Sequence, residues 1–135
     1  MEQLDKSLLI RSPLRIEADG SFRMNASIAD GAEAYLLTGS LSACQAAARS
    51  AVEQALEGLG RSRPVLALVL ADIAWQMLFE AQPGGDIAAV QEALGKKVPI
   101  AGGYTLGQIV PGGEGTPQFL NQHIVVLLFG EGREK

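Results

Sequence analysis

An amphipathic segment at 42–60, followed at once by an apolar run at 64–70, constrains the fold more than any other feature of the sequence. In the first segment apolar residues recur at helical intervals from Cys44 to Leu59, and Gly60 suits a left-handed helix end. The run at 64–70 has the length of a strand and contains no polar side chain. Because helical patterns stand on both sides of this run, we expect it to be a buried central strand.

The remaining segments predict further strands and two shorter helices around this pair. Strand patterns are found at 8–16, 22–26, 34–38, 98–110 and 119–129. Helix patterns are found at 73–81 and 86–94, with Asp86 placed as a cap of the second. The order β-β-β-α-β-α-α-β-β predicts a mixed α+β (α/β) fold with about six strands in a single mixed sheet and the helices mainly on one face. The first two and the last two strands are expected to pair as antiparallel hairpins.

The length of 135 residues fits a single domain. We expect this domain to span 8–130, after a flexible lead at 1–7 and before a solvated tail at 131–135. No internal repeat and no long linker divides the sequence.

Charge and cysteine content narrow the class of partner. The net charge is −4 and the basic residues are scattered, so neither nucleic acid nor an anionic membrane is expected as a partner. A single cysteine, Cys44, cannot form an internal disulfide, and its place on the helical stripe makes it a packing residue. The polar start lacks the apolar core of a signal peptide, so we expect a cytoplasmic protein. An apolar fraction of 47% leaves room for a buried surface of a self-associating domain.

The stretch 98–110 has the most unusual composition in the chain. Glycines and polar side chains stand where a core strand would have branched apolar residues: Gly102, Gly103, Gly107, Tyr104, Thr105 and Gln108. One interpretation is a twisted strand that is kinked against a neighbouring helix. The other is a cavity opened by the missing side chains, so that the stretch is the floor of a binding site. The glycines do not match a dinucleotide fingerprint, which lies at a strand-to-helix turn.

Three further polar residues are candidates for ligand binding. Asp72 follows the central strand, at the edge where α/β sheets bind ligands, but it also suits the cap of the next helix. Asn121 lies in the polar start of the predicted strand at 119–129 and either closes a turn or recognises a polar ligand. His123 is the only histidine, which does not make a metal site on its own; it suits a ligand hydrogen bond, a general base or a plain hairpin position. No nucleophile signature surrounds these residues, so we predict no catalytic residue, metal or cofactor.

Taken in order, these segments resemble the C-terminal half of the FIST sensory domain family, found in bacterial signalling proteins and in some F-box proteins. Asp19-Gly20-Ser21 followed by 28–32 resembles the family's Asp-Gly-Ser and Ile-Pro-Glu-Gly hairpin. The stretch 99–109 is similar to its Gly-Phe-Tyr-Thr-Tyr-Gly-Glu-Ile signature, and Asn121-Gln122 with the closing strand resembles its final element. Two positions depart from the family: Gln108 replaces the signature glutamate, and Asp72 stands where a Ser-Cys pair is frequent.

The resemblance implies a non-catalytic intracellular sensory module that binds a small molecule, such as an amino acid or a similar metabolite. Ligand contacts are then expected near Tyr104, Thr105, Gln108 and Asn121, and the signal is expected to pass to an attached signalling domain or a protein partner. The departures at Gln108 and Asp72 imply either a changed ligand preference or a loss of ligand binding. A ligand-free scaffold or oligomerisation domain is the alternative, since the family's N-terminal half has no counterpart here and self-association would complete the sheet. A small enzyme that uses Asp72 or His123 is the third hypothesis.

Overall fold

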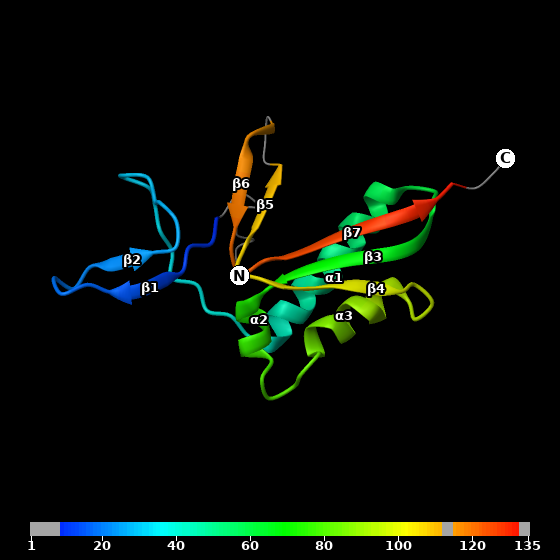
Figure 1. Ribbon diagram of the computed structural model, residues 1–135, viewed down its shortest axis with the longest axis horizontal. Helices are drawn as coiled ribbons and strands as arrows, with labels where there is room; N and C mark the ends of the chain where they lie inside the picture. The colour runs from blue at the N-terminus through cyan, green and yellow to red at the C-terminus, as the bar shows by residue number, and fades with distance from the viewer. Residues whose placement is uncertain (1–8, 112–114, 133–135) are drawn as a thin grey trace.

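The computed structural model describes residues 9–111 and 115–132 and has a mixed α+β architecture (Figure 1). The elements are β1 (Pro13–Ile16), β2 (Phe22–Met24), α1 (Leu41–Leu59), β3 (Arg63–Asp72), α2 (Ile73–Leu78), α3 (Gly85–Leu94), β4 (Ile100–Thr105), β5 (Gln108–Pro111), β6 (Pro117–Leu120) and β7 (Ile124–Glu131). The predicted fold class is thereby confirmed. The predicted lead at 1–7 and the last three residues of the predicted tail at 131–135 lie outside the described residues.

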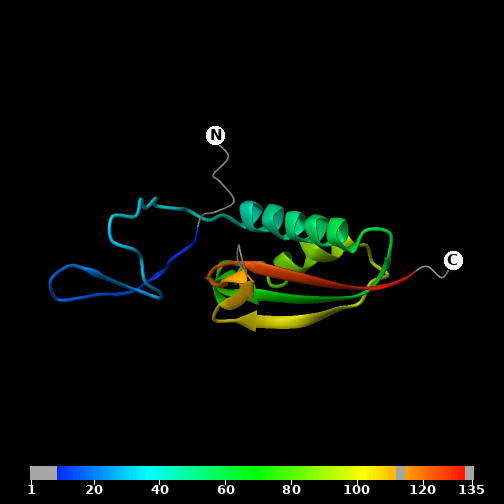
Figure 2. The same cartoon turned by 90° about the horizontal axis from the view of Figure 1, so that it is seen from above.

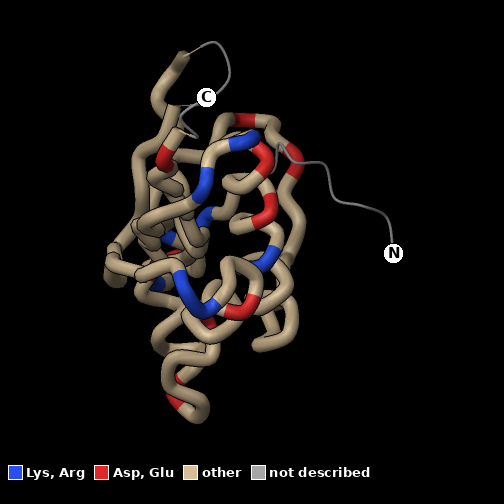
Figure 3. The backbone as a smooth tube through the Cα atoms, turned by 90° about the vertical axis from the view of Figure 1, so that its right-hand side faces the viewer, with Lys and Arg blue, Asp and Glu red and all other residues tan. Residues whose placement is uncertain are grey.

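The largest sheet has three strands in the order β4-β3-β7. β3 runs parallel to β4 and antiparallel to β7, so the sheet is mixed and β3 is its central strand, as its apolar run predicted. Figure 2 shows α1 and α3 on one side of this sheet, which confirms that the helices cover mainly one face. Figure 3 shows basic residues interspersed with acidic ones along the described backbone.

The other strands form two separate antiparallel pairs, β1–β2 and β5–β6, so that the strands are divided over three sheets, in place of the single sheet of about six strands that the sequence predicted. Each of the two long predicted strands is interrupted by a residue with positive φ. Gly107, with φ 142°, separates β4 from β5, and Gln122, with φ 57°, stands between β6 and β7. At these two interruptions the pairing of the three-stranded sheet ends, and β5 and β6 leave it and pair with each other.

The predicted strand at 34–38 is wrong, because these residues have no regular secondary structure. Tyr35 and Leu36 are exposed. Their alternation resembles that of a strand, but a strand needs a neighbouring edge with which to pair, and none of the described strands pairs with this stretch.

The core lies between the helices and the sheet and is built largely from small and branched side chains. Its buried members are Ala48, Val52, Ala67, Val69, Trp75, Phe79, Ala89, Val90 and Leu94. Alanines on α1, β3 and α3 allow these elements to approach closely. Cys44 is partly buried and packs against this core, which confirms its predicted role. Among the described residues no helix combines the length and the apolar character needed to cross a membrane.

Candidate functional site

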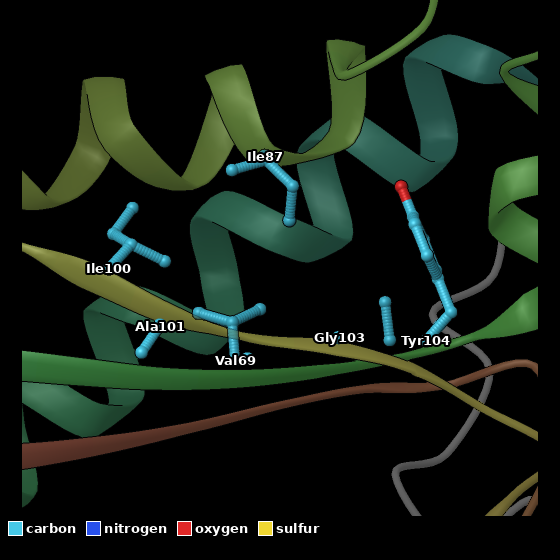
Figure 4. Close-up of a pocket in the computed structure, with 8 residues that line it drawn as sticks. Val69, Ile87, Ile100, Ala101, Gly103 and Tyr104 are labelled. Carbon is cyan, nitrogen blue, oxygen red and sulfur yellow. The ribbon is translucent and has the colours of Figure 1, made fainter.

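A cavity of about 270 Å³ lies between α3 and the strands β3 and β4, and we call it the α3–β4 cavity (Figure 4). Its lining residues are Val69, Ala71, Ile87, Ile100, Ala101, Gly102, Gly103 and Tyr104. In Figure 4, Ile87 reaches down from α3, whereas Val69 and Ile100 point towards it from the sheet. The lining is therefore mostly apolar, and Tyr104 supplies its one polar side chain.

The two glycines in this lining differ in what an added side chain would meet. A Cβ atom on Gly102 would lie 1.8 Å from the carbonyl oxygen of Val69, and its φ of 148° disfavours any other residue. Gly102 therefore allows β4 to pass close to the backbone of β3. A Cβ atom on Gly103 would meet nothing within 4 Å. The interpretation as a kinked strand thus applies to Gly102, although its close neighbour is a strand and not a helix. Gly103 pairs with Leu70, so a side chain at this position would point to the face of the sheet away from the helices, and Gly103 lines the cavity with its backbone.

Tyr104 connects the cavity to a buried carboxylate. Its hydroxyl donates a 2.9 Å hydrogen bond to Oδ2 of Asp86, which is wholly buried in the first turn of α3. Burial raises the pKa of Tyr104 to about 12, with further contributions from the hydrogen bond and the negative charge of Asp86. The other carboxylate oxygen, Oδ1, has no hydrogen-bond partner among the described residues. At this end of the cavity, the Tyr104 phenol is thus hydrogen-bonded to the buried carboxylate of Asp86.

Asp86 was not predicted as a site residue. The sequence suggested a capping role, but the cap position is occupied by Gly84 and no side chain caps α3. Asp86 precedes Tyr104 by 18 residues, so their contact depends on how α3 packs on β4, and no local pattern announces it.

The other residues predicted to bind a ligand, apart from Gly102 and Gly103, lie near Asp72 at the end of the three-stranded sheet. Asp72 is buried and is the last residue of β3. Its Oδ1 accepts a hydrogen bond from the Ala74 amide (2.9 Å), which confirms the helix-cap role at the start of α2. Its Oδ2 accepts from Asn121 Nδ2 (3.0 Å) and from the Gln122 amide (2.9 Å). Both carboxylate oxygens are therefore engaged in structural hydrogen bonds, a geometry that favours a structural role over catalysis.

Further hydrogen bonds connect Asn121 and Gln122 to the base of the β1–β2 hairpin. Asn121 Oδ1 accepts from the Ser12 hydroxyl (2.7 Å), and Gln122 Nε2 donates to the same hydroxyl (2.8 Å). Ser12 and Asn25 hold the hairpin base together, since each backbone amide donates to the other residue. The Asn121 side chain therefore links the end of β3 to the base of the β1–β2 hairpin. We call the set formed by Asp72, Asn121, Gln122, Ser12 and Asn25 the Asp72 network.

Thr105 and Gln108 lie beside this network and do not line the cavity. Thr105 stands opposite Asp72 in the pairing of β3 with β4. Gln108 Nε2 donates to the Thr105 hydroxyl (2.7 Å), while its buried Oε1 has no partner within the described residues. His123 is bound to the backbone, with Nδ1 2.6 Å from the Asn121 carbonyl oxygen. The eight predicted residues thus divide into two places: Gly102, Gly103 and Tyr104 at the cavity, and Asp72, Thr105, Gln108, Asn121 and His123 at the end of the sheet.

Within the described residues, no three histidine, cysteine or acidic side chains gather as a metal site would require. The family model of the FIST C domain matches residues 1–111. This range contains the whole lining of the α3–β4 cavity as well as Thr105 and Gln108. No curated protein and no solved structure matches the chain significantly.

Proposed function

The chain belongs to the FIST C domain family of sensory signal-transduction domains, and on this basis we propose that it binds a small metabolite in the α3–β4 cavity and relays its presence to a partner. The observation that carries this proposal is the cavity itself, with apolar walls and the Tyr104–Asp86 pair at one end. A few convergent polar groups in an apolar hollow are typical of small-molecule sites.

The size of the cavity supports a small ligand. About 270 Å³ lies just below the range of ligand pockets, which begins at about 300 Å³. An amino acid with an apolar side chain, or a metabolite of similar size, suits this volume: its apolar part would lie against Ile87 and Ile100, and its polar part against Tyr104.

The relay follows from the elements that such a ligand would touch. It would contact α3 and β4 together and so change the free energy of their packing. Thr105 follows Tyr104 in β4 and holds Gln108 of β5 by a 2.7 Å hydrogen bond. A displacement of Tyr104 would therefore also displace the β5–β6 pair. We propose that a signalling partner binds to this pair and responds to its position.

Isothermal titration calorimetry and thermal-shift assays with the individual amino acids test this proposal. We expect at least one apolar amino acid to bind, and Ile87→Phe to abolish binding because the larger side chain fills the cavity. Met77→Ser is the matched control, because Met77 is exposed on α2 and does not line the cavity.

Two results would count against the proposed site. One is the failure of every amino acid to bind the folded chain, and the other is binding that Ile87→Phe leaves unchanged. Circular dichroism on each variant verifies that the helices and the sheet remain folded.

A further inference from the structure

One face of the three-stranded sheet is apolar and uncovered, and we call it the open sheet face. Ala67, Val69 and Ala71 of β3 are buried on the helix side, so the alternate residues of β3 point to the other side. With their partners on β7, the residues of the open sheet face are Leu66, Leu68, Leu70, Val125, Leu127 and Phe129. Leu127 and Phe129 remain 45% and 51% exposed. Figure 2 shows no described helix or strand packed against this face.

The β1–β2 hairpin carries a second apolar surface. Ile16 pairs with Phe22, which places both side chains on one face, whereas Arg15 pairs with Arg23 on the other. Ile16 and Phe22 are 67% and 61% exposed. The hairpin extends away from the rest of the fold (Figures 1 and 2). Since a lone two-stranded hairpin is marginal in water, its apolar face requires a partner.

The exposed area of the chain is larger than that of a compact monomer. The chain exposes 10084 Å² at a mass of 14.2 kDa, whereas a compact protein of this mass exposes about 6,800 Å². If the residues outside the described ranges are counted as fully extended chain, the surplus of the described residues is still about 1,700 Å². A standard protein interface buries about 800 Å² per partner, so the surplus exceeds what a stable dimer needs.

We propose that two copies of this chain exchange their β1–β2 hairpins, so that the hairpin of each copy covers the open sheet face of the other. Both surfaces are apolar and built from strands, and such faces pack against each other about 10 Å apart. A two-fold axis satisfies both surfaces of both copies at once, which is the commonest symmetry of protein dimers.

The position of the hairpin favours exchange over folding back. Its base is held by Ser12 to Asn121 and Gln122, at the start of β7. From this point the hairpin extends in one direction and the sheet in the other (Figure 1). Arg15 and Arg23 lie on the face that would remain in solvent. The α3–β4 cavity lies on the helix side of the sheet, so the dimer leaves it open and does not depend on the proposed function.

Sedimentation equilibrium on the full chain provides the first test. The unaltered chain is expected to be a dimer, and Phe22→Ser and Leu127→Ser are each expected to raise the dimer dissociation constant at least about tenfold through lost apolar burial. Met77→Ser is the control for an exposed apolar residue outside both surfaces, and it should leave the dissociation constant unchanged. A monomer at about 100 μM, or a dimer unaffected by both substitutions, would overturn the proposal.

Cross-linking distinguishes a hairpin that covers the sheet of the other copy from a hairpin that folds back onto its own sheet. In a Cys44→Ser background, Phe22→Cys and Leu127→Cys chains are prepared separately, mixed, and treated with a short bismaleimide. Exchange predicts a covalent heterodimer that joins one chain of each kind, in excess over either homodimer. A chain that carries both cysteines and links only within itself would show that the hairpin covers its own sheet, and would overturn the proposal.

Discussion

The Tyr104 hydroxyl donates a 2.9 Å hydrogen bond to the carboxylate of Asp86, and this contact joins β4 to the first turn of α3. It is the polar contact at the boundary of an otherwise apolar cavity. A buried carboxylate that loses a donor becomes costly, because water does not reach it. The stability of the fold and the shape of the cavity therefore depend on the same pair.

Replacement of Tyr104 by phenylalanine is expected to lower the free energy of unfolding by about 1–3 kcal/mol, since Oδ2 of buried Asp86 then lacks its hydrogen bond. Urea denaturation followed by circular dichroism measures this change. Tyr35→Phe is the matched control: its hydroxyl bonds to Glu33 at an exposed position, and we expect a change below about 0.5 kcal/mol. Equal effects of the two substitutions would contradict the role given to the Tyr104–Asp86 pair.

The pKa of Tyr104 also predicts how stability depends on pH. The folded-state pKa is raised to about 12 by burial, by the hydrogen bond to Asp86 and by its charge, whereas an unfolded tyrosine titrates near about 10. Between these values the unfolded chain loses the phenolic proton and the folded chain keeps it. The unfolded state then binds fewer protons, so stability falls as pH rises from about 10 to 12. Because Tyr104 is partly exposed, solvent screening reduces the size of this effect.

Absorbance at the tyrosinate band and urea denaturation at several pH values measure the two sides of this linkage. Tyr104→Phe should remove the phenol that titrates last and should weaken the loss of stability at high pH. An unchanged titration curve in that variant would show that the phenol with the raised pKa is not that of Tyr104.

We expect the removal of the Asp72 carboxylate to lower the free energy of unfolding by more than the removal of an ordinary helix cap does. Its carboxylate accepts hydrogen bonds from Ala74, Asn121 and Gln122. Asp72→Ala leaves these three donors without their acceptor, so we expect a loss of about 3 kcal/mol or more in the free energy of unfolding. Urea denaturation checks this value, with Asp30→Ala at an exposed position as the control. A loss below about 1 kcal/mol would be that of a simple cap and would contradict the role of the Asp72 network.

The parts of the fold that follow from neighbouring residues could be predicted from the sequence. α1 and β3 were expected within a few residues of their bounds, because helical periodicity and a continuous apolar run are local signals. The strand predicted at 34–38 failed because pairing depends on a distant edge. The division of 98–110 into β4 and β5 was not predicted, because the sequence does not specify which glycine interrupts a strand. Gly102 and Gly107 both have positive φ, but only Gly107 lies between two strands.

The candidate site was predictable only in part for the same reason. Composition drew attention to Gly102, Gly103 and Tyr104, which do line the cavity. Thr105 and Gln108 stand near Tyr104 in sequence but lie at the end of the sheet with Asp72. Asp86 was overlooked because its contact with Tyr104 is made only by tertiary packing.

The two adjacent glycines of β4 give the sharpest test of how closely β4 lies against β3. In Gly102→Ala the new Cβ atom would lie 1.8 Å from the Val69 carbonyl oxygen, at a φ of 148°. Relief of this overlap requires β4 to separate from β3, so we expect a loss above about 4 kcal/mol in the free energy of unfolding, or no folded protein. In Gly103→Ala the Cβ atom meets nothing within 4 Å. An alanine there restricts the unfolded chain, so we expect stability to be unchanged or raised by up to about 1 kcal/mol. Urea denaturation of both variants makes the comparison. If Gly103→Ala were as damaging as Gly102→Ala, the close approach of β4 to β3 would not be specific to Gly102, and the role given to Gly102 would be contradicted.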